Sequence, residues 1–311
     1  MNQTINKEMS INEWLILLVL SFIWGGSFYF IEIAVTELTP LVLVFLRVSI
    51  AAVALWIFIL IKGLAVPKRG SHWLAFFIMG LLNNVIPFTL IAWGQIYIAS
   101  GLASIFNATT PLFVVIVAGV FLADERPNGL KIMGVIIGFA GVVIMVGSSA
   151  LQGLSSNVLA QLAILAAALS YSFAAVYGRR FTTMNLHPIV VAAGQVSMSA
   201  SILFVVLIFM GPPVDTLMPS AQALSAVFTL AILCTAVAYT LAFKLLASAG
   251  ATNLSLVTFL VPITAILLGF LLLNESLELE HLVGMLMIAI GLSAIDGRVW
   301  KSIFPTSAAG Q

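Results

Sequence analysis

Two long intervals without ionised side chains constrain this chain more than any other feature. Histidine aside, nothing charged lies between Arg69 and Asp124, or between Lys131 and Arg179. Each interval is long enough for two membrane crossings of about 20 residues, and such crossings fold as helices because lipid offers the backbone no hydrogen-bond partners. With 311 residues, 62% hydrophobic and 7% charged, the chain has too few charges to cover a soluble surface. We predict an all-α polytopic membrane protein.

Ten transmembrane helices fit between the turn-forming residues. Their expected ranges are 14–35, 41–61, 72–94, 98–122, 130–147, 158–178, 188–210, 221–244, 252–273 and 281–297. Only the mild polar break at Gly94–Tyr97 separates the third helix from the fourth, and a merged helix would reduce the count to nine. No connection leaves room for a soluble domain, and residues 1–13 and 298–311 are expected to be tails.

The positive charges predict the orientation. With ten helices and the N-terminus inside, Arg47 alone of the 12 Lys and Arg residues lies within a span, and the others fall on the cytoplasmic side. Such a bias sets topology. Both termini, and therefore both tails, are predicted to be cytoplasmic.

An imperfect repeat divides the chain into halves. The stretch Ala99–Glu125 returns as Ala247–Glu275, each running from small and polar residues through a proline and an apolar segment to a glutamate. The matched residues are Gly101 with Gly250, Pro111 with Pro262, and Glu125 with Glu275. Five helices per half is an odd number, so residues 14–147 and 158–297 are expected to form two inverted repeats. Such repeats can open a midplane site to either side in turn.

Several motifs resemble one transporter superfamily. They are Trp24-Gly25-Gly26-Ser27-Phe28, Phe45-Leu46-Arg47, the proline helices that end at a glutamate, and Tyr171 to Arg180. Together they resemble the drug/metabolite transporter superfamily in its EamA-type branch, over about 14–295, and most closely the YddG-type exporters of aromatic amino acids. The resemblance implies a ten-helix basket around a central cavity, with the fifth and tenth helices outside, and export of small metabolites across a bacterial inner membrane.

The composition also bears on partners and cofactors. A net charge of +1 argues against a nucleic-acid partner, since phosphate binding needs a concentrated basic face. The lone Cys234 is expected to be a small buried apolar residue. The sequence has no HExxH, Gly-x-Ser-x-Gly or Walker motif and no metal-ligand cluster, so we predict no cofactor, no metal and no enzyme. Expected partners are a small-molecule substrate and lipid; a monomer is plausible, and no oligomer is implied.

Polar residues within spans are the first candidates for the cavity. They are costly in lipid unless they face the protein interior, where they either hydrogen-bond between helices or contact substrate. Asn83 and Asn84 precede Pro87, a position where a helix loses a backbone hydrogen bond. The predicted cavity set also contains Ser27, Asn107, Thr110, Ser255 and Thr258, and its aromatic members are Trp24, Phe88, Tyr171 and Tyr239. Gly134 and Gly138, with Gly141, Gly284 and Gly291, offer small faces for packing within the chain or for a dimer.

Arg47 is the one charge deep within a span, and it needs an anion or a water-filled pocket. Two interpretations are open, a structural pair with Glu32 or direct capture of a substrate carboxylate. Pro111 and Pro262 are the predicted gating elements. We predict export of small amphiphilic metabolites, aromatic or other neutral amino acids, by alternating access without ATP. The alternatives are proton-coupled metabolite or drug transport and, from a different class, an intramembrane enzyme.

Overall fold

The computed structural model describes residues 9–151, 155–210, 218–254 and 256–297, and within these ranges every regular element is helical. This confirms the all-α polytopic fold. The helices are α1 (Ile11–Val35), α2 (Pro40–Lys62), α3 (Gly70–Gly80), α4 (Ile86–Gly94), α5 (Ser100–Asn107), α6 (Thr110–Phe121), α7 (Gly129–Leu151), α8 (Ser156–Gly178), α9 (Pro188–Met210), α10 (Ala221–Ala231), α11 (Ala238–Leu254), α12 (Val257–Leu273) and α13 (Leu279–Asp296).

These helices make ten apolar crossings in the described part of the chain. Nine are long enough to span a bilayer by length and composition, and the tenth, α12, has 17 residues. The third span (Gly70–Gly94) is separate from the fourth (Ser100–Phe121), so the merged alternative is wrong. Tyr97 and Ile98 form a turn there by donating backbone hydrogen bonds to the carbonyl of Gly94.

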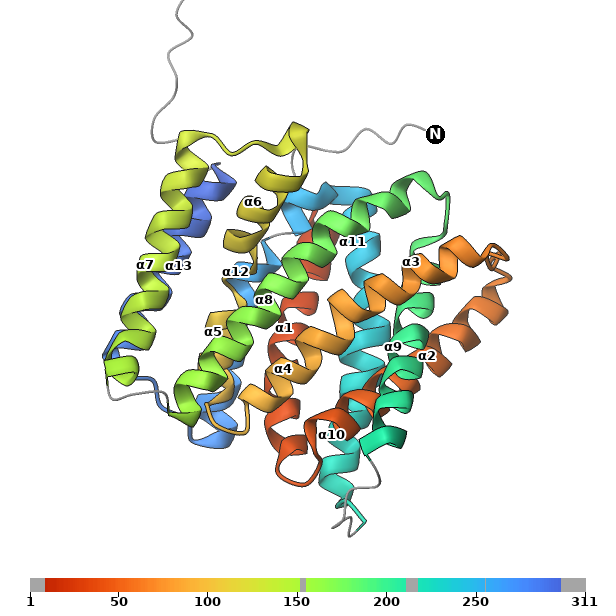
Figure 1. The fold of residues 1–311 in the computed structure, drawn as a ribbon, viewed down its shortest axis with the longest axis horizontal. Coiled ribbons are helices and arrows are strands. Elements are labelled where there is room, and N and C mark those ends of the chain that lie inside the picture. The colour runs from red at the N-terminus through yellow and green to blue at the C-terminus, as the bar shows by residue number, and fades with distance from the viewer. Residues whose placement is uncertain (1–8, 152–154, 211–217, 255, 298–311) are drawn as a thin grey trace, which may run out of the picture.

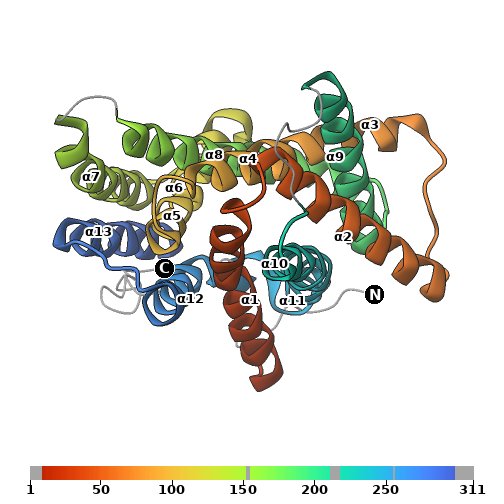
Figure 2. The same ribbon diagram turned by 90° about the horizontal axis from the view of Figure 1, so that it is seen from below.

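The packing of the spans follows a regular scheme (Figures 1 and 2). α1 packs against α12 and α10, while α8 packs against α6 and α4; α2 packs against α9, and α7 against α13. The first five spans are α1, α2, α3–α4, α5–α6 and α7, and the next five are α8, α9, α10–α11, α12 and α13. When each span is replaced by its counterpart in the other set, the α1–α12 contact becomes α8–α6 and the α1–α10 contact becomes α8–α4. The α2–α9 and α7–α13 contacts are unchanged by this replacement. The α7–α13 pair lies at one end of the molecule and α2, α3 and α9 at the other, with α1, α10 and α11 between them.

Glycines allow the closest of these helix contacts. A Cβ placed on Gly134 would lie 2.6 Å from the carbonyl oxygen of Gly291, and one on Gly141 would lie 2.7 Å from that of Gly284. The two backbones therefore touch at two levels of the α7–α13 crossing, as small-residue interfaces permit. These glycines pack within the chain, and a Cβ on Gly138 would instead meet Leu112 of α6.

Two spans contain a π-helical turn at repeat-related places. Residues Leu81–Val85 join α3 to α4, and Ile232–Val237 join α10 to α11. The starting residues, Leu81 and Ile232, differ by 151, which is also the spacing of Pro111 and Pro262. A π turn widens the helix and frees backbone groups, and such turns often occur at functional sites. The expected helices 72–94 and 221–244 are therefore not regular throughout.

The expected helix 98–122 corresponds to one span, Ser100–Phe121, which a short turn divides in two. α5 ends at Asn107 and α6 begins at Thr110, and Ala108 and Thr109 between them keep right-handed helical dihedral angles. Pro111 lies in the first turn of α6, where its missing N–H costs nothing. In the second half, Gly250 takes a left-handed conformation (φ 82°) within α11, and α12 begins at Val257 with Pro262 inside it.

Candidate functional site

A hydrogen-bonded polar cluster joins the first π-helical turn to α9 and to the start of α11. Asn83 Nδ2 donates to Gln195 Oε1 and to Tyr239 Oη, both at 3.3 Å, and Tyr239 Oη donates to Asn84 Oδ1 at 2.9 Å. Asn84 Nδ2 in turn donates to Ser199 Oγ at 3.1 Å. The third, seventh and eighth spans therefore meet through side chains in the interior. We call Asn83, Asn84, Gln195, Ser199 and Tyr239 the central polar cluster.

Side-chain hydroxyl groups donate hydrogen bonds to backbone carbonyls around both π turns. The carbonyl of Leu82, inside the first π turn, accepts a hydrogen bond from Ser170 Oγ of α8 at 2.7 Å. At the second turn, Thr235 Oγ1 donates to the carbonyl of Leu230, five residues earlier, at 2.8 Å. Hydroxyl groups thus satisfy backbone carbonyls near both turns, as broken transmembrane helices require. Sequence reasoning placed the break at Pro87, whereas the irregular turn lies immediately before it.

Arg47 lies beside this cluster and is 5% exposed. Its Nε donates to Thr235 Oγ1 at 3.0 Å, and its Cζ lies 3.8 Å from the centre of the Phe88 ring. Tyr171, Tyr239 and Cys234 are close enough to interact with it electrostatically. The structure therefore brings the predicted residues Arg47, Phe88, Tyr171 and Tyr239 together, and adds Thr235.

Of the two interpretations left open for Arg47, the pair with Glu32 is not formed. Arg47 makes no ion pair with any acidic residue among those described, and Glu32 Oε2 instead accepts from Gln95 Nε2 at 3.1 Å. The same Gln95 nitrogen donates to the carbonyl of Phe28 at 2.8 Å. Glu32 is therefore tied to the end of α4, while Arg47 is tied to the second π turn.

The other predicted cavity residues are spread more widely. Trp24 and Ser27 lie on α1, where Ser27 Oγ donates to the carbonyl of Trp24 at 2.6 Å, a bond within the helix. Asn107 lies at the end of α5, and its carbonyl accepts from Thr110 Oγ1 at 2.7 Å. Asn107 Oδ1 is enclosed and accepts no hydrogen bond. Thr258 is partly buried on α12, and Ser255 lies outside the described residues.

The two repeat glutamates have different partners. Glu275, just past α12, accepts from the backbone N–H groups of Ser100 and Gly101 at 2.8 and 3.0 Å, and so caps the first turn of α5. Its counterpart Glu125 forms an ion pair with Arg179 at 3.0 Å. A carboxylate at a helix N-terminus is favoured by the unpaired N–H groups and the helix dipole. Glu275 therefore joins the ninth span to the fourth by capping the N-terminus of α5, and we call this the fastened end of the molecule.

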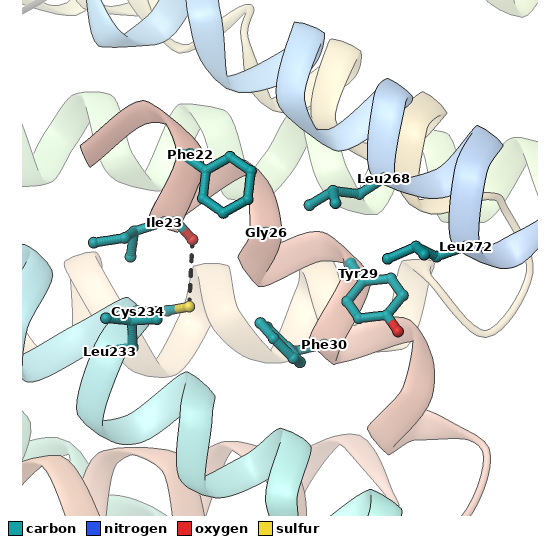
Figure 3. A pocket seen from close by; sticks show the side chains of 9 residues that line it. All are labelled: Phe22, Ile23, Gly26, Tyr29, Phe30, Leu233, Cys234, Leu268 and Leu272. Atoms are coloured by element: carbon teal, nitrogen blue, oxygen red, sulfur yellow. Dashed lines mark hydrogen bonds between the residues drawn. The ribbon is translucent and has the colours of Figure 1, made fainter. Parts of the chain in front are cut away.

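A shallow apolar hollow of about 130 Å³ lies elsewhere, among α1, the second π turn and α12 (Figure 3). Phe22, Tyr29 and Phe30 point into it from α1, and Leu268 and Leu272 from α12. Cys234 Sγ donates to the carbonyl of Ile23 at its edge, at 3.3 Å. None of the predicted cavity residues lines it. Phe22 and Leu272 are 60% and 56% exposed, as expected for side chains that face lipid.

Sequence reasoning missed several residues of the site. Gln195, Ser199, Thr235 and Gln95 were not among the predicted cavity residues. Thr235 follows Cys234 in the second π turn, and the repeat offset from Asn83 and Asn84 was the signal that could have found it.

Comparison with known proteins decides the family. The model of the EamA-like transporter family matches residues 12–147 and again 158–295. The chain belongs to the EamA-like transporter family. It is therefore a multi-pass membrane transporter of the drug/metabolite transporter superfamily.

Similar transporters occur in several bacteria. This transporter is 26% identical to the uncharacterized transporter YoaV of Bacillus subtilis, over 89% of its own length and 94% of that protein. It is 28% identical to the uncharacterized inner membrane transporter YedA of Escherichia coli K12, over 93% and 91% of the two chains. A protein of known crystal structure superposes with a TM-score of 0.65 at 20% identity, over 91% and 96% of the chains. That likeness supports the fold.

Proposed function

We propose that this transporter exports small amphiphilic metabolites, aromatic or other neutral amino acids, from the cytoplasm through one central site that opens to either side in turn. The observation that carries this proposal is the central polar cluster, which joins the first π-helical turn to Tyr239, two residues past the second π-helical turn. A cluster of amides beside tyrosine and phenylalanine rings offers hydrogen bonds to a polar head and stacking surfaces to a flat side chain.

The exchangeable packing of spans five places apart supports two halves, residues 14–147 and 158–297, arranged as inverted repeats. In an inverted repeat, each half can adopt the conformation of the other half, so that the closed end of the molecule opens while the open end closes. The unequal glutamates fit one such conformation, because Glu275 fastens its end and Glu125 does not cap a helix. In this proposal Pro111 and Pro262 lie in the moving fourth and ninth spans, and the fastened end is the outer one.

Arg47 is the one buried charged residue in the described spans, and Glu32 lies only three residues before the last residue of α1, so movement down the gradient of the substrate is the simplest mechanism. Glu32 with Gln95 is the one carboxylate arrangement within a span that favours the alternative, coupling to protons. The two mechanisms differ in their response to a pH gradient.

The test is efflux from proteoliposomes loaded with labelled phenylalanine, tryptophan or leucine, with and without a pH gradient. We expect saturable efflux that Tyr239→Phe slows at least several-fold, because the phenylalanine removes the hydroxyl that joins Asn83 to Asn84. The matched control is Tyr97→Phe, since Tyr97 is 41% exposed at a span end. Equal rates for wild type and empty liposomes would refute the proposal, and efflux that requires the pH gradient would replace the gradient-free mechanism with proton coupling.

A further inference from the structure

Arg47 is a buried cation in α2. It is the eighth residue of that helix, roughly 10 Å along it from the first residue. It is 5% exposed, and no acidic side chain in the described part of the chain pairs with it. A guanidinium in this position is expensive unless an anion or water satisfies it. The described residues supply a hydrogen-bond acceptor for one of its N–H groups.

Thr235 and Phe88 are the protein groups that hold the guanidinium of Arg47. The guanidinium has five N–H groups, of which the one on Nε donates to Thr235. Phe88 covers the guanidinium on one side, with its ring centre 3.8 Å from Cζ. The two terminal nitrogens donate to none of the described residues, and neither is fully enclosed. Thr235 and Phe88 therefore hold the side chain in place and leave its forked end free.

We propose that the two terminal nitrogens of Arg47 bind the carboxylate of the transported molecule. The proposal rests on the proposed function and names the chemical group of the substrate that Arg47 recognises. A guanidinium fork matches a carboxylate with two parallel hydrogen bonds, and such charge-assisted pairs are the strong ones.

The surroundings define the rest of the ligand. The Phe88 ring lies against the guanidinium, Tyr171 and Tyr239 interact with it electrostatically, and the amides of Asn83 and Asn84 bond to Tyr239. A singly charged carboxylate matches the single arginine, because no other Lys or Arg among the described residues is buried. The predicted ligand is a small monocarboxylate whose apolar or aromatic body lies against these rings.

A pair of probes isolates the carboxylate. 3-Phenylpropionate and 3-phenylpropanamide have the same shape and differ only in the charged group. Purified protein in detergent is heated with increasing amounts of each probe, and the concentration giving half of the maximal thermal protection is measured. We expect the carboxylate to protect wild type at a concentration at least tenfold lower than the amide does, the difference expected for hydrogen bonds to a charged group.

Variants then assign the effect to Arg47. Arg47→Gln should abolish the tenfold preference, and Arg47→Lys should keep only part of it because lysine lacks the fork. The matched control is Arg69→Gln, which removes an exposed arginine from the start of α3 and should leave the preference intact. If Arg47→Gln does not fold, Thr235→Val and Thr235→Ser answer the same question. The valine removes the acceptor of Nε and should weaken the preference several-fold, whereas the serine retains it.

Two results would overturn the proposal. One is equal protection of wild type by both probes. The other is an undiminished carboxylate preference in Arg47→Gln. A purely structural arginine would instead lower the melting temperature of the ligand-free Arg47→Gln variant and leave the wild-type protein indifferent to the probes. The assay needs no transport, so failure of amino-acid efflux and failure of carboxylate binding are seen separately.

Discussion

Replacement of Glu275 by alanine tests whether one end of the molecule is held shut by a carboxylate. Glu275 joins the end of α12 to the first turn of α5 through the N–H groups of Ser100 and Gly101. Gly269 makes room for it, because a Cβ at that position would lie 2.2 Å from Oε2 of Glu275. The alanine variant removes both hydrogen bonds and the anion at the helix N-terminus.

The size of the effect follows from these two bonds. A hydrogen bond to a charged group contributes about 1.5–3 kcal/mol, but Glu275 is only partly buried, so water competes for it. We therefore expect a loss of about 2 kcal/mol for the pair. This corresponds to a roughly 30-fold increase in the ratio of open to closed states at this end.

Labelling of a hidden cysteine measures that ratio. Ser104 is 0% exposed on α5 behind the cap, and the native Cys234 is 1% exposed. In a Cys234→Ala background, a Ser104→Cys substitution should react slowly with a membrane-impermeant maleimide. Glu275→Ala should raise the reaction rate by about the same 30-fold.

Glu125→Ala is the matched control, because it removes the repeat-related glutamate from the other end. It should leave the labelling rate at Ser104→Cys unchanged or lower. If Glu275→Ala labels at the same rate as the parent, the carboxylate does not hold this end closed and the reasoning is wrong.

Three further predictions concern packing and polar contacts. Asn84→Ala should lower the free energy of unfolding by about 1–3 kcal/mol, because Asn84 is 0% exposed and the substitution leaves Tyr239 and Ser199 without their partner; thermal denaturation in detergent checks this, and an unchanged melting temperature would contradict it. Gly291→Val should cost about 1–3 kcal/mol by overpacking, since a Cβ there would lie 2.4 Å from the carbonyl oxygen of Gly134, whereas Gly129→Val, with nothing within 4 Å, should cost less in the same melting assay. Hydrogen bonds from Ser220 hold the pKa of Glu37 below its usual range, so this contact should persist at neutral pH and weaken as the pH falls through that lowered pKa; hydrogen exchange at Ser220 should then increase, and exchange independent of pH, after correction for the intrinsic rate, would argue against it.

Much of the fold could be predicted from the sequence because charge is so scarce in it. Apolar runs of about 20 residues between Lys, Arg and turn residues leave few alternatives to helices. The repeat of Pro111 and Pro262 pointed to equivalent places in two halves. What the sequence did not reveal was local irregularity, because a π turn such as Leu81–Val85 has the same composition as an ordinary apolar helix.

The sequence predicted several residues of the candidate site but not the contacts between them. Arg47, Phe88 and Tyr239 were each named, and the structure brings them together around Thr235. The pair of Arg47 with Glu32 was one of two interpretations, suggested because Glu32 lies on the preceding helix. The sequence does not show which face of α1 approaches α4. Gln95 takes that position and binds Glu32 instead.

Exchange across the membrane of proteoliposomes tests the central claim most directly. Vesicles containing the purified transporter are loaded with labelled phenylalanine, and efflux is followed with and without unlabelled phenylalanine outside. A single site that opens to either side in turn predicts saturable efflux that external phenylalanine accelerates, and that external phenylpropanamide does not. Efflux that rises linearly with concentration and ignores the external solution, or no efflux of any amino acid, would contradict the account.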